Sequence, residues 1–182
     1  QKRWFGISLS WLEGPNGNRI GTIGVSKEIS AKRKLEEKLR RLSITDKLTG
    51  LYNQSHFFQR LEIEKERALR LGHSLSLLLF DLDGFKKLND AQGHVLGDAL
   101  LRGIGGVLFK NVRKEVDSAF RYGGDEFTVL LPGADADTAV KFADRVREQI
   151  VALRVEGQTL AVGASMGVTC FDKEDRSQQI IA

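Results

Sequence analysis

The chain has 182 residues, enough for one ordinary domain and a smaller appendage, and its 41% hydrophobic content can form a buried core, which argues against a disordered chain. Lys and Arg (28) exceed Asp and Glu (24) by only four, and no basic tract alternates with aromatic residues, so the composition argues against nucleic-acid binding. Cys170 is the only cysteine, which excludes an intrachain disulfide framework, and no Cys/His cluster has the spacing of a zinc site.

The expected location is a reducing cytoplasm. No apolar stretch is long enough to cross a bilayer, and the first residues contain neither an initiator Met nor the apolar core of a signal peptide. We therefore expect a cytoplasmic protein, or the cytoplasmic portion of a membrane-attached sensor, without membrane contact in this segment. The start of the sequence is typical of a segment cut from a longer protein.

Residues 1–29 have the pattern of a β-hairpin. Apolar residues alternate with small ones over 4–12, and the extended pattern resumes over 20–29. Between them, residues 14–18 read Gly-Pro-Asn-Gly-Asn, a strong turn signal. Because a lone two-stranded hairpin is marginally stable in water, we expect the rest of its sheet to lie upstream.

A charged helix is expected from residue 30 to 42. Leu35, Leu39 and Leu42 recur on one stripe, and acidic and basic residues four apart add favourable pairs. The stripe covers under two heptads, so two alternatives stay open: a coiled coil between two copies of the chain, or a solvated connector with one packed face. In either case we assign 30–45 as a linker.

From residue 46 the sequence alternates helices and strands. Four apolar residues share the face of a first helix: Phe57, Leu61, Ala68 and Leu71. The continuous apolar run over 74–80 is typical of a strand buried on both sides. A helix follows over 97–112, although its glycines weaken the helical signal.

The last third of the chain is expected to contain a hairpin over 117–131, then a helix, then a final strand over 162–171. The helix is defined by five apolar residues, Val140, Ala143, Val146, Ile150 and Leu153. Asp135 or Asp137 could cap it. The whole order predicts an α+β fold with a central, mostly antiparallel sheet and flanking helices, in the split βαβ arrangement of ferredoxin-like and palm-like domains.

A pair of carboxylates ends the 74–80 strand. Asp81 and Asp83 are two residues apart, so both point to one face of the sheet. A divalent cation, Mg²⁺ or Mn²⁺, would offset the cost of burying unpaired acids there. Asp83 could instead cap the helix after Gly84, so Asp81 is the better metal ligand.

The hairpin turn is the second candidate site, because residues 121–127 read Arg-Tyr-Gly-Gly-Asp-Glu-Phe. Glycine pairs suit tight turns because they tolerate positive φ, and their missing side chains let a phosphate approach the backbone. If the turn lies beside the strand end, Asp125 and Asp81 converge on one metal while the Gly123-Gly124 backbone admits phosphates. An ordinary charged hairpin is the alternative for Asp125 and Glu126.

These motifs resemble those of the GGDEF family of diguanylate cyclases. Residues 123–127 match the family's signature, and 46–53, Asp-Lys-Leu-Thr-Gly-Leu-Tyr-Asn, resemble its opening segment. Residues 80–90 resemble its metal and phosphate segment, and 93–98 its guanine-contacting segment. The resemblance implies a domain over 46–182 that works as a homodimer, in which each protomer holds one GTP and the two are joined head to tail into cyclic di-GMP with release of pyrophosphate.

The resemblance also assigns roles to individual residues. It implies metal binding by Asp81, the backbone carbonyl of Leu82, and Asp125. It implies a catalytic turn of Gly123, Gly124, Asp125 and Glu126, in which Glu126 either assists with the metal or orients the attacking hydroxyl. It implies binding of the terminal phosphates by the amides of Gly84 and Phe85 and by Lys86, whose charge sits on a flexible stem.

Guanine recognition is implied for Asn89 and Asp98. A carboxylate can accept from N1–H and the exocyclic amine of guanine, and adenine offers no such pair of donors. A family branch that makes a mixed GMP-AMP product has a small hydroxyl residue at the second position, so Asp98 favours guanine alone. The structural alternatives are a helix-ending turn for Asn89 and an acid in a first helical turn for Asp98. For His94 we expect a packing role, and for Asp46 a turn-bonding one.

Two departures from the family pattern affect the expectations. Members usually continue past the last strand into a helix whose Lys and Arg hold terminal phosphates, and this sequence stops at Ala182, so we expect that helix to be missing. Many members carry Arg-x-x-Asp ahead of the signature to bind the product. Here Asp117 is preceded by Lys114 at the matching position, with Arg113 one residue further out, and we expect weak or absent product inhibition.

Residues 1–29 resemble the closing hairpin of a PAS sensor domain, and 28–33 resemble its exit motif. This implies an upstream sensor that acts through the 30–45 linker. A noncatalytic receptor for GTP or cyclic di-GMP is the alternative function, and the intact signature acids favour the enzyme.

Overall fold

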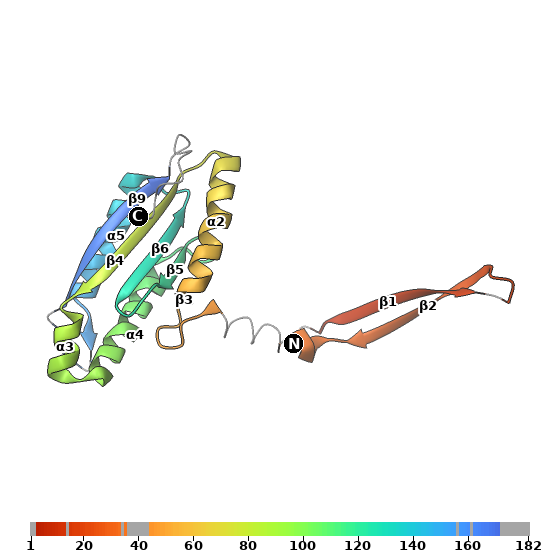
Figure 1. The fold of residues 1–182 in the computed structure, drawn as a ribbon, viewed down its shortest axis with the longest axis horizontal. Coiled ribbons are helices and arrows are strands. Elements are labelled where there is room, and N and C mark those ends of the chain that lie inside the picture. Colours follow the sequence, from red (N-terminus) through yellow and green to blue (C-terminus); the bar gives the residue numbers. More distant parts are fainter. Residues whose placement is uncertain are drawn as a thin grey trace. The chain divides into compact units, whose positions relative to one another are not determined.

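Figure 1 shows the computed structural model of the chain. The described residues are 3–13, 15–33, 35, 44–155, 157–160 and 162–171. They belong to two compact units, Gln1–Ser43 and Ile44–Ala182. Within the described residues, no helix has both the length and the apolar character needed to cross a membrane.

The first unit contains the predicted hairpin. Its strands β1 (Phe5–Glu13) and β2 (Arg19–Glu28) pair antiparallel, and their large apolar side chains are exposed. A helical stretch begins at Ser30, whose hydroxyl oxygen accepts a hydrogen bond from the Trp4 amide at 2.9 Å. Most of the predicted linker helix, residues 36–43, lies outside the described residues.

The second unit is built around a five-stranded sheet with the order β3-β5-β6-β4-β9. Its strands are β3 (Tyr52–Asn53), β4 (Leu75–Asp83), β5 (Ser118–Arg121), β6 (Glu126–Pro132) and β9 (Gly163–Phe171). Strands β3 and β5 run parallel, and the other three pairs are antiparallel. A separate ladder joins β7 (Arg154–Val155) to β8 (Gln158–Thr159). The predicted α+β fold with a mostly antiparallel central sheet is confirmed.

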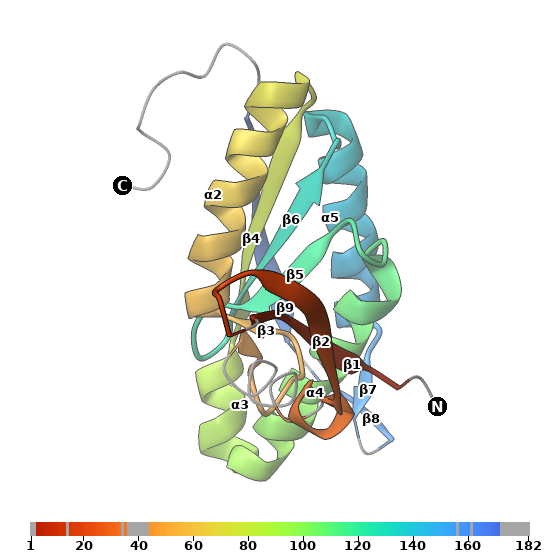
Figure 2. The ribbon, with the colours of Figure 1, turned by 90° about the vertical axis from the view of Figure 1, so that its right-hand side faces the viewer.

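Helices cover both faces of this sheet, and Figure 2 shows α2 and α5 on opposite sides of it. The helices are α2 (Gln54–Leu71), α3 (Phe85–Gln92), α4 (His94–Asn111) and α5 (Ala136–Val151). Leu78 of β4 belongs to the larger core, with residues of α4 and α5, whereas Leu77 belongs to a smaller core with Phe57 of α2. Strand β4 is therefore buried on both sides from Leu75 to Leu78, as predicted, whereas Leu79, which is 47% exposed, and the two acids that follow it are not buried.

Local signals set the ends of the helices. The side chain of Asn53 accepts a hydrogen bond from the His56 amide at the start of α2, and Gly72, with φ 68°, ends that helix. The side chain of Asp135 accepts from the amide three residues on at 2.8 Å, so Asp135 rather than Asp137 caps α5.

Two residues predicted to face the core are exposed, Leu71 by 59% and Val140 by 48%. Leu71 is the last residue of α2, next to the turn that ends it. The buried residues of α5 are Ala139, Phe142, Ala143, Val146 and Ile150. Periodicity identifies an apolar face, but tertiary packing decides which of two neighbouring apolar residues points inward. Leu153, also predicted for this helix, lies beyond its end and is half-buried.

Candidate active site

Strand pairing places the hairpin turn beside the end of β4. Across the β4–β6 pair Asp81 lies opposite Glu126, and across the β4–β9 pair it lies opposite Ser165. Asp125 directly precedes Glu126 in the turn, which we call the signature turn (residues 122–126). Acidic residues that are distant in the sequence therefore meet at one end of the paired strands β4 and β6, and the sequence predicts that the turn lies beside this strand end.

The two acids of β4 are exposed. Asp81 accepts a hydrogen bond from the Leu82 amide at 2.7 Å, and Asp83 accepts one from the Ser165 hydroxyl at 2.7 Å. Leu82, between them, points into the larger core. The two carboxylates thus share a face as predicted, but the expectation that they are buried is wrong, because α2 leaves this part of the sheet uncovered. The alternative role of Asp83 as a helix cap is also wrong, since the cap of α3 is Gly84.

The signature turn uses its glycines differently from the prediction. Neither Gly123 nor Gly124 has positive φ. A Cβ at Gly123 would lie 2.5 Å from a carboxylate oxygen of Glu126, so a larger residue would displace the end of that side chain from its present position. A Cβ at Gly124 would meet nothing within 4 Å, which leaves this stretch of backbone open to a ligand. The amide of Tyr122 closes the turn by donating to the Glu126 carbonyl at 2.8 Å.

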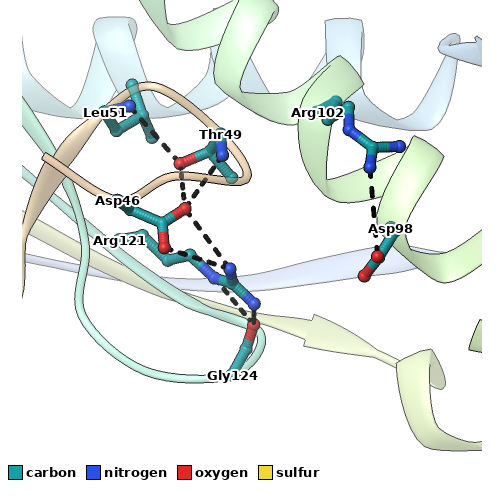
Figure 3. A network of polar contacts seen from close by, with 7 residues as sticks. All are labelled: Asp46, Thr49, Leu51, Asp98, Arg102, Arg121 and Gly124. Atoms are coloured by element: carbon teal, nitrogen blue, oxygen red, sulfur yellow. Dashed lines mark hydrogen bonds and ion pairs between the residues drawn. The ribbon is translucent and has the colours of Figure 1, made fainter.

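Arg121 joins the signature turn to the loop of residues 46–51, which we call the opening loop (Figure 3). Its Nη2 and Nε donate to the Gly124 carbonyl at 2.7 and 3.1 Å, and its Nη1 lies 3.3 Å from both carboxylate oxygens of Asp46. Asp46 also accepts from the amide and the hydroxyl of Thr49, at 2.9 and 2.7 Å. The predicted turn-bonding role of Asp46 is confirmed.

Several groups act on the ionisation of Asp46. Partial burial alone would raise the pKa of its carboxyl, but the hydrogen bonds from Thr49 and the charge of Arg121 outweigh burial and bring the pKa below its ordinary value. A lowered pKa stabilises the fold at pH values above the ordinary aspartate pKa, and this contribution is lost as the pH falls through the lowered value. Asp46 is therefore ionised near neutral pH, as an ion pair with Arg121 requires.

The start of α3 has the features of an anion site. Gly84 precedes the helix with φ 81°, and no side chain among the described residues caps it. The first amides of a helix lack partners within the helix and favour negative charge. Lys86 is exposed on the first turn, beside Phe85. The residues predicted to bind phosphate thus lie together, directly after the acids of β4.

The two residues predicted to bind guanine lie on neighbouring helices. Asn89 of α3 has a buried side-chain oxygen for which the described residues supply no hydrogen-bond partner. That oxygen lies against Gly97 of α4, where a Cβ would collide with it. Asp98, the next residue, is 49% exposed and lies 4.0 Å from the guanidinium of Arg102 (Figure 3). His94 is exposed at the start of α4, so the packing role predicted for it is wrong.

A family model described as "Diguanylate cyclase, GGDEF domain" matches residues 43–182. The chain belongs to the GGDEF family. This GGDEF domain therefore accounts for most of the sequence, and the hairpin of β1 and β2 precedes the matched segment.

Proteins named as diguanylate cyclases are similar to this chain in sequence and in structure. The chain is 37% identical over 146 residues to the diguanylate cyclase DgcP of Pseudomonas aeruginosa, an alignment that covers 79% of this chain and 22% of DgcP. Diguanylate cyclase SiaD of Pseudomonas aeruginosa, solved with its activator SiaC, is 38% identical with a TM-score of 0.69, over 80% of this chain and 56% of that one. The coiled coil and GGDEF domain of DgcB from Caulobacter crescentus, solved with c-di-GMP, is 27% identical with a TM-score of 0.73, over 80% and 78%.

The chain spans 22% of the length of DgcP, so it corresponds to a fraction of such a relative.

The groups predicted to bind a metal ion have the chemistry that suits a hard cation. Asp81, Asp125 and the carbonyl of Leu82 offer only oxygen atoms. Among the described residues, no group of three or more His, Cys, Asp or Glu side chains is arranged to hold a metal ion. Magnesium is commonly bound by one or two carboxylates together with substrate phosphates, and Asp81 and Asp125 are the carboxylates that could hold it here.

Sequence reasoning missed three contributors to the site: Arg121, Ser165 and Gly97. The position of Arg121, two residues before the glycine pair, is its only signal in the sequence. Ser165 and Gly97 act through neighbours that become adjacent only in the folded chain, Asp83 and Asn89.

Proposed function

We propose that this GGDEF domain is a diguanylate cyclase, which joins two molecules of GTP into cyclic di-GMP and releases two of pyrophosphate. The observation that carries the proposal is the pairing of Asp81 with Glu126, because it brings the signature turn to the strand end that precedes α3. Family membership and the names of the relatives support the same activity.

The phosphates of GTP are bound at the start of α3. The amides of Gly84 and Phe85 donate to the terminal phosphates, and Lys86 adds a positive charge from its exposed position. Gly124 leaves room for the phosphates to approach the turn. Asp81, Asp125 and the carbonyl of Leu82 would hold Mg²⁺ or Mn²⁺, which when bound neutralises phosphate charge.

The reaction requires two protomers. The 3′-oxygen of one GTP forms a bond to the α-phosphorus of the other, the bond from that phosphorus to the bridging oxygen breaks, and pyrophosphate leaves with the electron pair. The hydroxyl proton passes to a base or to solvent. Glu126 either orients the attacking hydroxyl or assists in metal binding, and its side chain packs over Gly123 in the signature turn. Because each protomer holds one GTP, catalysis takes place between two copies facing each other.

Base selection is assigned to Asn89 and Asp98. Asp98 accepts from the Watson–Crick donors of guanine, and Asn89 adds a side-chain amide whose oxygen has no partner among the described residues. A site built to pair with these donors rejects adenine, which would leave its acceptors unsatisfied. GTP is therefore the expected sole substrate.

The segment before the domain is assigned a signalling role. The exposed apolar side chains of β1 and β2 support the assignment of residues 1–29 to the end of a PAS-like sensor domain, with 30–45 as the linker to the cytoplasmic cyclase. A noncatalytic receptor for GTP or cyclic di-GMP is the alternative function. The acids of the signature turn favour the enzyme.

Incubation with GTP, with ATP, or with both, in the presence of Mg²⁺, tests the proposal when the products are identified by mass spectrometry. We expect cyclic di-GMP from GTP and no product containing adenine. Asp125→Ala should abolish turnover, because the turn loses its metal-binding carboxylate. Asp137→Ala, which removes an exposed acid from α5, is the matched control and should retain activity. Binding of GTP without any turnover would support the receptor instead.

A further inference from the structure

We propose that Arg121 is a positioning residue for the signature turn: by bonding the Gly124 carbonyl and the Asp46 carboxylate together, it orients Asp125 toward the substrate. This rests on the proposed cyclase function. Among the described residues, Arg121 makes no hydrogen bond or ion pair with Asp125 or Glu126; its partners are Gly124 and Asp46. Its contribution is to the geometry of the turn.

The contact with Gly124 acts directly on the backbone of Asp125. The carbonyl of Gly124 and the amide of Asp125 belong to one planar peptide unit, so fixing the carbonyl direction also fixes the plane from which Asp125 projects. Nη2 and Nε of Arg121 converge on this oxygen at 2.7 and 3.1 Å. Gly124 has no close neighbour where a side chain would stand, so the turn has little packing of its own at this point.

The opening loop supplies a rigid anchor. Its backbone closes on itself, with the Gly50 amide donating to the Asp46 carbonyl at 2.9 Å and the Asp46 amide to the Leu51 carbonyl at 2.8 Å. Thr49 is buried and lies so close to α4 that a Cβ at Gly105 would be 2.7 Å from the Thr49 carbonyl oxygen. Asp46, bonded twice by Thr49, is thereby tied to the larger core.

The contacts of the Arg121 guanidinium favour a positioning role over phosphate binding, because its nitrogen atoms already have acceptors within the protein. Nε, Nη1 and Nη2 of Arg121 are all engaged, by Gly124 on one side and Asp46 on the other. The two side chains are only 18% and 23% exposed, so solvent screens the ion pair weakly. A planar fork of five donors can bridge two acceptors in this way, and the ammonium of lysine cannot reproduce it.

A second arginine bridge, in the segment just before β5, is the matched control. Arg113 donates to both carboxylate oxygens of Asp117 and to the Pro132 carbonyl, and this bridge precedes β5 whereas Arg121 ends it. Arg113→Lys removes a guanidinium contact of the same kind, before the start of β5, whereas the signature turn follows the end of that strand. If kcat depended only on stability, it would fall in both variants. If it depends on the position of the signature turn, it should fall only in Arg121→Lys.

The experiment compares Arg121→Lys, Arg113→Lys and the unaltered chain in thermal unfolding and in steady-state kinetics with GTP and Mg²⁺. For Arg121→Lys we expect kcat to fall about tenfold, equivalent to about 1.4 kcal/mol, with KM for GTP changed less than about twofold. Adding Asp46→Asn to Arg121→Lys should cause little further loss, because both changes break one network. Arg113→Lys should lower the melting temperature and leave kcat unchanged.

Hydrogen exchange of the amides in residues 122–126 gives a readout that does not depend on activity. In Arg121→Lys we expect faster exchange in this turn, and in Arg113→Lys the same rate as in the unaltered chain. Equal exchange in all three proteins would overturn the inference, as would equal losses of kcat in both variants. If the unaltered chain made no cyclic di-GMP, the proposed function would fail while the exchange result still decided the role of Arg121.

Discussion

The contact between Gly97 and Asn89 shows how a single missing side chain can shape a binding site. Asn89 is half-buried, its side-chain oxygen has no partner among the described residues, and only a glycine at position 97 leaves room for it. An unpaired buried acceptor costs free energy unless a ligand supplies the donor. A guanine bound between α3 and α4 would supply donors there, which connects this packing detail to the proposed substrate.

Gly97→Ala is predicted to impair GTP binding. The added methyl group collides with the Asn89 side chain and forces it to move, so we expect about a tenfold weaker affinity for a non-hydrolysable GTP analogue, measured by calorimetry. Gly106→Ala on the same helix is the control, because a Cβ there meets nothing within 4 Å. It should leave the affinity unchanged and raise the stability of α4 by up to about 1 kcal/mol. Unchanged affinity in Gly97→Ala would count against the guanine assignment.

At the scale of elements, the apolar pattern predicted the main helices and strands because a continuous apolar run forms the buried part of β4 and burial follows one stripe in α2 and α5. It could not predict the exposure of Leu79 and of Val140, since that depends on where a helix lies across the sheet. Strand β3 has only two residues, too few for a pattern, and its parallel pairing with β5 is visible only in the folded chain.

The candidate site was predictable to a similar extent. The convergence of Asp81 with the signature turn followed from the hairpin and the strand end, which are features of local sequence. The roles of Gly123 and Arg121 were not predictable, because the first depends on a side chain across the turn and the second on a loop distant in the sequence. Such contacts leave no periodic signal.

The segment between α4 and β5 leads to a prediction about feedback. Arg113 donates its backbone amide and its guanidinium to Asp117, whose side chain is only 2% exposed, and this hydrogen bonding raises the pKa of Arg113. Asp117, at the position where the resemblance implies a product-binding Asp, is thus bonded within the domain, and Lys114 has no guanidinium group. We expect cyclic di-GMP at micromolar concentrations to leave the initial rate unchanged. Inhibition in that range, in assays of initial rate against added product, would contradict this.

At the scale of the whole molecule, the sheet bears on the proposal that the reaction takes place between two copies. Helix α2 packs over β5, β6 and Leu77 of β4, and Leu79, Asp81 and Asp83 of β4 remain exposed beyond it. The acids, the start of α3 and the signature turn all lie around this open part of the second unit. In the proposed function one such surface holds a single nucleotide, so the partner GTP would be presented by another chain.

Mixing active and inactive chains tests whether both protomers of a dimer need an intact site. If both phosphodiester bonds require an intact site in each protomer, Asp125→Ala chains that pair with unaltered chains should produce inactive dimers. In an equal mixture at fixed total concentration, about a quarter of the dimers would contain two unaltered chains, and the rate should fall to about a quarter of that of the unaltered protein. Catalysis by independent protomers would instead leave about half of the rate. Asp137→Ala chains, mixed in the same way, should leave the rate nearly unchanged, because their signature turn retains Asp125.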